Sequence, residues 1–169
     1  KANIALDYHK ADSALAMLRM AEAYAEWKQY PVFAYQHGVA LLSKLDTGCI
    51  VYFMQYLRDN KSDLYIKDAW QKMAFAWYVA GNDAKAGWCL SQIRKHGSTG
   101  IDADKQAQRF AETGRWPLRK LLQARLLIEG GYYDKALSIL QGIGQAELHE
   151  ADRAEYHYRL GKAYEEMGL

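Results

Sequence analysis

The chain has 169 residues, of which 50% are hydrophobic and 25% charged, a composition that supports one folded domain and excludes predominant disorder. Its formal net charge of +2 is too small to indicate nucleic acid or an anionic membrane surface as the main partner. The two cysteines cannot form a disulfide framework, and no apolar run approaches the length of a membrane span.

Apolar residues recur at helical spacing along the chain, and no segment shows the sustained alternation that is typical of strands. The two prolines, Pro31 and Pro117, fall where helices are expected to begin, because a first turn tolerates a missing N–H. Turn residues separate the apolar segments, as in GNDAKA from Gly81 and GYYDKA from Gly131. These signals predict ten helices, at 3–9, 11–28, 31–44, 47–59, 63–80, 83–96, 103–112, 117–129, 133–142 and 150–167.

A repeated spacing pairs these helices into hairpins. In the segment 70–81 a large residue is followed by another large residue, a small residue, an aromatic residue and a glycine, and 157–168 follows the same order. A second signature, an alanine followed at helical spacing by two apolar residues, starts at Ala86 and at Ala136. The small residue lets a neighbouring helix approach closely, and the glycine ends the first helix in a left-handed conformation. Each unit is therefore predicted to be helix, tight turn, helix.

The hairpins recur with a period of about 36 residues, with one interruption. Gly38 and Ala74 are 36 residues apart, whereas Ala74 and Ala124 are 50 apart, an excess of 14. The added segment contains DADKQAQRFAETG, which predicts a separate short helix from Asp102 to Gly114. We expect a single helical-repeat domain over 1–169, with units at 1–29, 31–60, 63–97 and 117–144, an insertion at 101–115 and an incomplete unit at 150–169.

The two signatures resemble the tetratricopeptide repeat, most closely in the first helix 157–168 and in the hairpin 70–93. The hairpin 117–143 departs from the pattern, since Lys120 and Gln123 occupy apolar positions. The strings YIKDAWQKMAF, DADKQAQRFAETGRWP, LLQARLLIEGGYYDKAL and EYHYRLGKAYEEMG are also similar to uncharacterised, envelope-type bacterial tetratricopeptide proteins. The resemblance implies an all-α, right-handed superhelix of antiparallel helical hairpins with one inserted short helix. It also implies a non-catalytic scaffold that binds a protein or peptide on its concave face.

In such superhelices the first helix of each hairpin lines the concave surface. The residues implied for that surface are Tyr35, Val39, Leu42, Gln71, Phe75, Tyr78, Leu121, Arg125, Ile128, Tyr158, Lys162 and Glu165. The groove would be apolar and aromatic at its N-terminal end and mixed in charge at its C-terminal end, which suits an extended peptide or an amphipathic helix. Arg125 and Lys162 could bind a carboxylate by donating to its oxygens. The alternative is that Tyr35, Phe75 and Tyr78 are covered by a neighbouring helix, such as 103–112.

The histidines indicate neither a metal site nor a catalytic base. None of the five has a second histidine or a cysteine four residues away, and Arg153 stands where the HEADR segment would need its second zinc ligand. His37 and His157 fall at packing positions of the repeat. The full set is His9, His37, His96, His149 and His157.

The remaining candidates for chemistry are also weak. Cys49 and Cys89 lie among apolar residues and are expected to be buried thiols. Seven residues separate Cys89 from His96, which places them about 10 Å apart on one helix, too far for a thiolate–imidazole pair. The GSTG segment at 97–100 lacks the lysine of a phosphate-binding loop. We therefore expect no enzymatic activity, no cofactor and no bound metal.

Two further expectations concern partners and environment. The alternative function is a non-catalytic glycan- or cell-wall-binding component of a larger bacterial envelope assembly, in which Trp88, Trp116 and Tyr133 would stack on sugars. The resemblance to envelope-type proteins favours the periplasm or cell envelope over the cytoplasm. The last helix lacks its own second helix, and the chain starts at Lys1. We expect either a fragment of a longer array or self-association through the C-terminal end.

Overall fold

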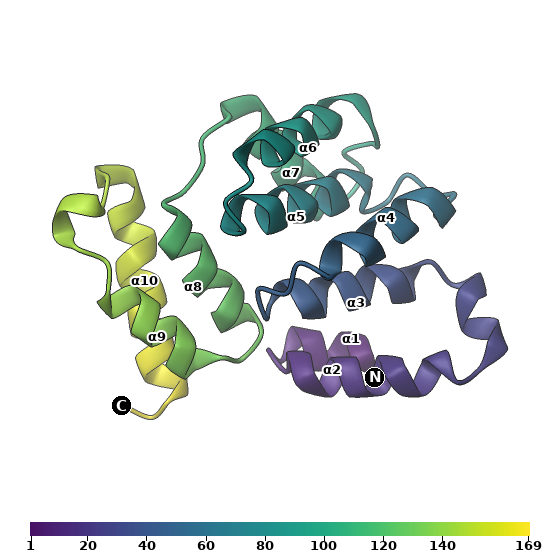
Figure 1. Ribbon diagram of the computed structural model, residues 1–169, viewed down its shortest axis with the longest axis horizontal. Coiled ribbons are helices and arrows are strands. Elements are labelled where there is room, and N and C mark those ends of the chain that lie inside the picture. Colours follow the sequence, from purple (N-terminus) through teal and green to yellow (C-terminus); the bar gives the residue numbers. More distant parts are fainter.

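The computed structural model describes residues 1–169 and is all-helical, with ten α-helices and no strand (Figure 1). None of these helices is both long and apolar enough to cross a membrane. The α-helices are α1 Ala2–Asp7, α2 Ala11–Glu22, α3 Val32–Leu42, α4 Cys49–Asp59, α5 Ile66–Val79, α6 Asp83–Lys95, α7 Asp102–Thr113, α8 Arg119–Glu129, α9 Tyr133–Gln141 and α10 Glu150–Glu166. Two short 3-10 helices, η1 Ala25–Gln29 and η2 Gln145–Glu147, lie between them.

The all-α class and the ten predicted helices are confirmed, and two helix ends differ from the prediction by more than two residues. The predicted helix 11–28 is wrong beyond Glu22, because Tyr24 adopts an extended backbone and the chain continues as η1. The predicted start at 63 is also too early. Tyr65 has a left-handed backbone with φ of 57°, so α5 begins at Ile66.

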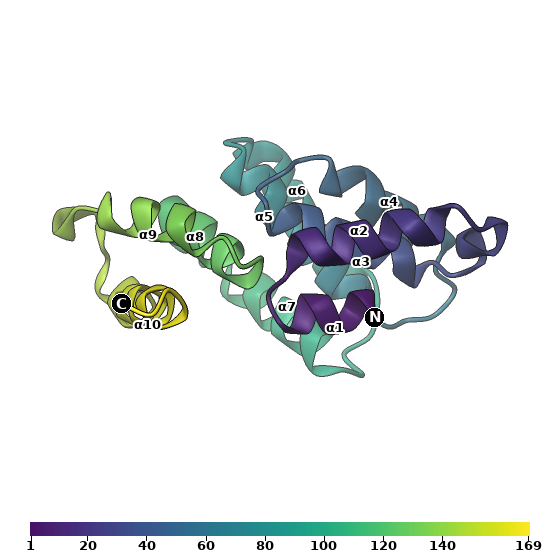
Figure 2. The ribbon, with the colours of Figure 1, turned by 90° about the horizontal axis from the view of Figure 1, so that it is seen from below.

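Consecutive helices pack as hairpins in the order α1–α2, α3–α4, α5–α6 and α8–α9. The second helix of a hairpin also packs on the next first helix, as α2 does on α3, α4 on α5 and α9 on α10. The inserted helix α7 packs on both α5 and α6. Figure 2 shows α10 beneath the α8–α9 pair, with α7 and α1 on the same lower side of the molecule.

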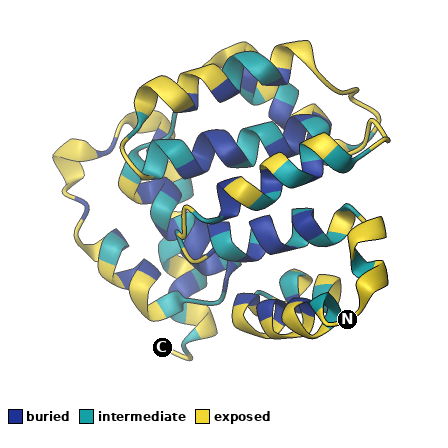
Figure 3. Ribbon diagram, turned by 45° about the vertical axis from the view of Figure 1, so that its right-hand side comes forward, coloured by how far each residue is buried: buried dark blue, intermediate teal, exposed yellow.

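Small residues and glycines occupy the positions that the repeat signature predicts. At Gly38 a Cβ atom would lie 2.6 Å from the ring of Phe53, a residue of α4 that is completely buried. The corresponding Ala74 and Ala124 are also completely buried. Gly81 and Gly131 have φ of +82° and +84°, the left-handed conformation expected where first helices end. In Figure 3 the buried residues form stripes on the helix sides that face one another.

A contact between residues far apart in the sequence joins the first and fourth hairpins. The turn between α8 and α9 lies against the turn between α1 and α2 (Figure 1). The Ala11 N–H donates to the Gly130 carbonyl at 3.2 Å, and the His9 Nδ1–H donates to the Glu129 carbonyl at 3.0 Å. A Cβ at Gly131 would lie 2.1 Å from the His9 carbonyl oxygen. We call this the closing contact, because it holds the first hairpin against the fourth.

Candidate peptide-binding groove

Three adjoining hollows run along the inner side of the helix array. The first, of about 520 Å³, lies among α1, α3 and α5; the second, of about 270 Å³, among α3, α5, α7 and α8; and the third, of about 370 Å³, among α5, α7, α8 and α10. Neighbouring hollows share lining residues, with Val39 and Lys72 between the first two and Phe75 and Arg125 between the last two. We call the continuous depression the inner groove.

Tyr35 and Asp68 build one wall of the inner groove. The Tyr35 hydroxyl donates to the carboxylate of Asp68, which also accepts from Lys72 Nζ at 2.8 Å. The Tyr35 ring packs on Tyr65, which lines the first hollow, and on the buried Tyr56 of α4 behind it. Burial, reinforced by the Asp68 charge, raises the pKa of Tyr35 well above its usual value. This hydroxyl therefore stays protonated and is held by its acceptor.

Asp104 of α7 fixes the start of α5 beside this wall. Its completely buried carboxylate accepts from the backbone N–H groups of Tyr65 at 2.8 Å and Asp68 at 3.0 Å. These N–H groups belong to a helix N-terminus, where a carboxylate from another element can replace the usual cap. Burial raises the pKa of Asp104, and the N–H groups of Asp68 and Tyr65 oppose that rise. The inserted helix thus orients Asp68 towards Tyr35.

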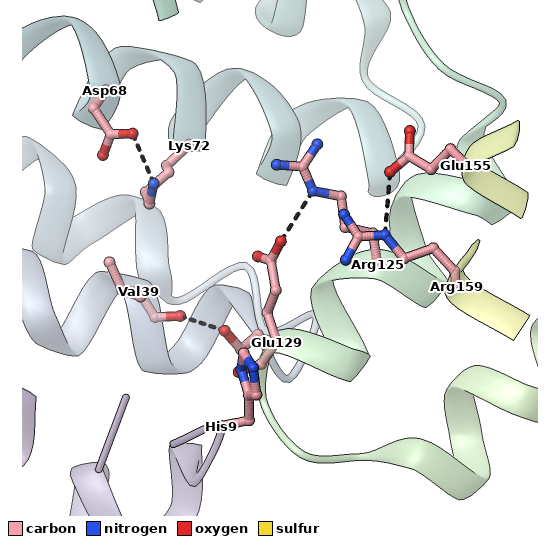
Figure 4. A network of polar contacts seen from close by, with 9 residues as sticks. His9, Val39, Asp68, Lys72, Arg125, Glu129, Glu155 and Arg159 are labelled. Atoms are coloured by element: carbon pink, nitrogen blue, oxygen red, sulfur yellow. Dashed lines mark hydrogen bonds and ion pairs between the residues drawn. The ribbon is translucent and has the colours of Figure 1, made fainter. Parts of the chain in front are cut away.

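Three ion pairs follow the inner groove on successive first helices (Figure 4). Each joins residues four apart on one helix: Asp68 and Lys72 at 2.8 Å on α5, Arg125 and Glu129 at 2.9 Å on α8, and Glu155 and Arg159 at 3.3 Å on α10. Both signs of charge therefore line the groove. At the C-terminal end these charges come from Arg125 and Glu155, whereas the predicted Lys162 and Glu165 line none of the three hollows.

The N-terminal end of the groove differs from its predicted apolar and aromatic character. Asp7, His9 and Lys72 line the first hollow together with Tyr35 and Gln36. The prediction is wrong because it considered one helix face at a time. The closing contact turns polar residues of the α1–α2 segment towards the same hollow.

The residues predicted for partner binding fall into three groups. Tyr35, Val39, Gln71 and Arg125 all line the inner groove and are partly exposed there. Phe75 also borders it, but only 7% of its surface is exposed. Its ring lies 5.3 Å from that of Phe110 in α7. For Phe75, the alternative prediction that the inserted helix covers the residue is therefore correct.

The second group is covered by the segment that follows α7 or by the core. The Tyr78 ring lies 4.5 Å from that of Trp116, and its hydroxyl donates to the Pro117 carbonyl at 2.9 Å. Leu121 is completely buried in the core between α8 and α9, and a partner cannot reach it in this conformation. Leu42 and Ile128 are also buried.

The third group lies outside the inner groove. Tyr158 is exposed on α10, and Lys162 pairs with Glu166 at 2.6 Å and Glu165 at 3.5 Å on the same helix. Neither Tyr158 nor Lys162 lines any of the three hollows.

Several lining residues were missed by the sequence reasoning. Gln36 lies directly after Tyr35, and Gln106 projects from the inserted helix. The four-residue spacing of Asp68 and Lys72, and of Arg125 and Glu129, was a signal for the ion pairs. No local signal placed Gln106 in the groove, because its position depends on how α7 packs against α5.

The site geometry defines an all-α protein with a long polar groove on the inner side of its helical hairpins. No group of three or more histidine, cysteine or acidic side chains is placed to hold a metal ion. The chain gives no significant match to a protein-family model, a curated protein or a solved structure.

Proposed function

We propose that this chain is a tetratricopeptide-like scaffold, a right-handed superhelix of helical hairpins that binds an extended segment of another protein without catalysing a reaction. Two features support the proposal: the recurrence of the hairpin signature with a period of about 36 residues, and the packing of second helices on the next first helix in α2–α3, α4–α5 and α9–α10.

The proposal depends mainly on one observation: several polar side chains that line the inner groove form no hydrogen bond within the chain. The side-chain amides of Gln36, Gln71 and Gln106 line it, and none of them bonds within the chain. An amide both donates and accepts, as a bound peptide backbone requires. At the middle of the groove Arg125 bonds to Glu129 only through Nε, which leaves both Nη groups for a ligand.

Peptide display followed by measured binding would test this function. Peptides selected from a random library on the wild-type chain would be labelled and titrated by fluorescence anisotropy. We expect Gln71→Ala and Arg125→Ala to weaken their binding by about tenfold or more each, since each removes groups that face the groove.

Two controls make the result specific. Arg58→Ala removes an exposed arginine of α4 that lies outside the groove, and it should leave binding unchanged. Phe75→Ala is unsuitable as a probe because Phe75 is packed under α7. Failure to select any peptide, or selected peptides that bind both groove variants as tightly as wild type, would contradict the proposal.

A second candidate is a non-catalytic glycan- or cell-wall-binding component of a bacterial envelope assembly. It is favoured by Trp88, whose side chain stands 55% exposed on α6 with its ring against Trp70. Trp116 is packed on Tyr78, so it offers less free surface. Binding to a cell-wall glycan array that is lost in Trp88→Ala would support this candidate over the first. Both functions fit the periplasm or cell envelope, the location that we propose from the resemblance.

A further inference from the structure

The second hollow of the inner groove, of about 270 Å³, is the smallest of the three and lies among four helices, α3, α5, α7 and α8. Val39 and Leu42 of α3, Phe75 of α5 and Leu126 of α8 give it apolar walls. Leu42, Phe75 and Leu126 are buried, so these walls are fixed by the core. The hollow therefore offers apolar contacts to the carbon atoms of a ligand.

All four charged residues that line the second hollow are already paired with one another. Asp68 accepts from Lys72 Nζ at 2.8 Å, and Glu129 accepts from Arg125 Nε at 2.9 Å. The two carboxylates and the two cations cancel in formal charge. A charged ligand group would therefore lose its hydration here without meeting an unmatched opposite charge.

The hydrogen-bonding groups of the second hollow, in contrast, are open to a ligand. The side-chain amides of Gln71 on α5 and Gln106 on α7 form no hydrogen bond within the chain. Arg125 engages only its Nε, and Glu129 only one carboxylate oxygen, so the Nη groups and the second oxygen stay free. Donors and acceptors therefore occur together around the hollow.

A carboxamide is the side-chain group that matches this set. Its oxygen accepts and its NH₂ group donates, so it can bond to donors and acceptors of the hollow together. A carboxylate has no donor for the amide oxygens, and an ammonium group has no acceptor for the Nη groups of Arg125. An apolar side chain would displace water and leave all of these groups without partners.

We propose that the second hollow is a specificity pocket for a glutamine or asparagine side chain of the bound segment. The inference rests on the proposed peptide-binding function and adds a requirement on the sequence of the peptide. The methylene groups of that side chain pack on the apolar walls, and its carboxamide bonds to Gln71, Gln106 and Arg125. The rest of the peptide follows the larger first and third hollows.

Peptides selected from a random library on the wild-type chain are the probes. Each position of a selected peptide is replaced in turn by glutamine, asparagine, glutamate, lysine and leucine, and the affinities are measured by fluorescence anisotropy. We expect one position at which glutamine or asparagine binds about tenfold or more tightly than glutamate, lysine and leucine.

Glu129→Gln provides a readout that a structural role of Glu129 would not change. The substitution keeps the size of the side chain and leaves the charge of Arg125 unmatched beside the hollow. The ratio of affinities for the glutamine peptide and its glutamate counterpart should therefore fall by about tenfold or reverse. Glu165→Gln, at an exposed position of α10 that lines none of the three hollows, is the matched control and should keep the wild-type ratio.

Gln71→Leu combined with Gln106→Leu removes both amides and keeps side chains of similar length. Both positions are at least partly exposed, and circular dichroism would verify that the variant is folded. The preference for glutamine over leucine at the selective position should fall to about threefold or less.

The outcomes distinguish this inference from the function on which it rests. Peptides that lose affinity in Gln71→Ala and Arg125→Ala, but prefer a carboxamide at no position, would overturn the pocket and leave the peptide-binding function standing. An unchanged ratio in Glu129→Gln, or a full preference in the double leucine variant, would also overturn the pocket. Failure to select any peptide would overturn both.

Discussion

Burial controls the chemistry of His37 on α3. Only 3% of this residue is exposed, and its ring stacks on Tyr52 with centroids 4.6 Å apart. Its Nε2 lies 3.4 Å from a carboxylate oxygen of Glu22. Burial lowers the pKa of His37, and the Glu22 charge opposes that change without cancelling it. The packing role predicted for this histidine from the repeat position is therefore confirmed.

This lowered pKa predicts a pH dependence of stability. The unfolded chain takes up a proton at His37 more readily than the folded chain does, so the stabilisation is full above the ordinary histidine pKa of 6.5 and is lost as the pH falls below it. His37→Phe retains an aromatic ring against Tyr52 and removes the titration. We expect the difference in free energy of unfolding between about pH 8 and about pH 5.5 to be smaller in this variant. An unchanged difference in urea titrations would contradict the assignment.

The two cysteines behave as the sequence predicts. Both thiols are free and completely buried. Burial raises the pKa of Cys49 to about 12 and that of Cys89 to about 11, so neither forms a thiolate at neutral pH. They act as small apolar residues of the hairpin cores.

At the scale of a helix pair, the close approach of α3 and α4 depends on the absence of a side chain at Gly38. The Phe53 ring fills the space where a Cβ would stand, 2.6 Å away, and Phe53 is enclosed by the largest core cluster. A residue in such a core has no room to move aside.

Two matched substitutions separate helix propensity from packing. Alanine in place of a helical glycine gains up to about 1 kcal/mol, whereas overpacking a core costs about 1–3 kcal/mol. Gly87 lies on α6 with nothing within 4 Å of its Cβ position. We expect Gly87→Ala to raise the free energy of unfolding and Gly38→Ala to lower it by about 1–2 kcal/mol. Urea denaturation would show this, and equal stabilisation of both variants would refute the packing argument.

At the scale of the whole molecule, the closing contact holds the first hairpin against the fourth. It also places the α1–α2 segment at the rim of the inner groove, where Asp7 and His9 line the first hollow. Asp12 of α2 adds an ion pair to Lys44 beyond the end of α3 at 2.7 Å. Both partners of that pair are substantially exposed, so it contributes at most about 1 kcal/mol.

Gly131 provides a test of the closing contact, with Gly81 as its control. Both glycines are left-handed, so alanine costs about 1–2 kcal/mol of backbone strain at either position. Only at Gly131 would the new methyl group also meet a backbone oxygen, that of His9. We expect Gly131→Ala to be less stable than Gly81→Ala by about 1–3 kcal/mol in urea unfolding, and to have a larger radius of gyration by small-angle X-ray scattering. Equal losses and equal dimensions would show that the contact does not hold the array closed.

Local sequence patterns were enough to predict the helices, the hairpin turns and the positions of small residues. A helix face, a left-handed glycine and a close helix approach each depend on residues within about two turns of one another, so their spacing is visible in the chain. Val39, Gln71 and Arg125 were placed at the groove for the same reason. Leu121 was misplaced because it is completely buried in a cluster with residues of α9 and α10, a packing that the spacing does not record.

The sequence by itself therefore determined the all-α class, the ten helices, the pairing signature and the buried cysteines. Only the tertiary structure decided that α7 covers Phe75, that Asp104 caps α5, and that the N-terminal end of the groove is polar. Each of these features depends on contacts between residues of separate elements. The hydrogen bond between His9 and Glu129, which are 120 residues apart in the sequence, is a contact of the same kind. Such contacts arise from the geometry of packed helices, and no local spacing encodes which distant backbone will meet a given side chain.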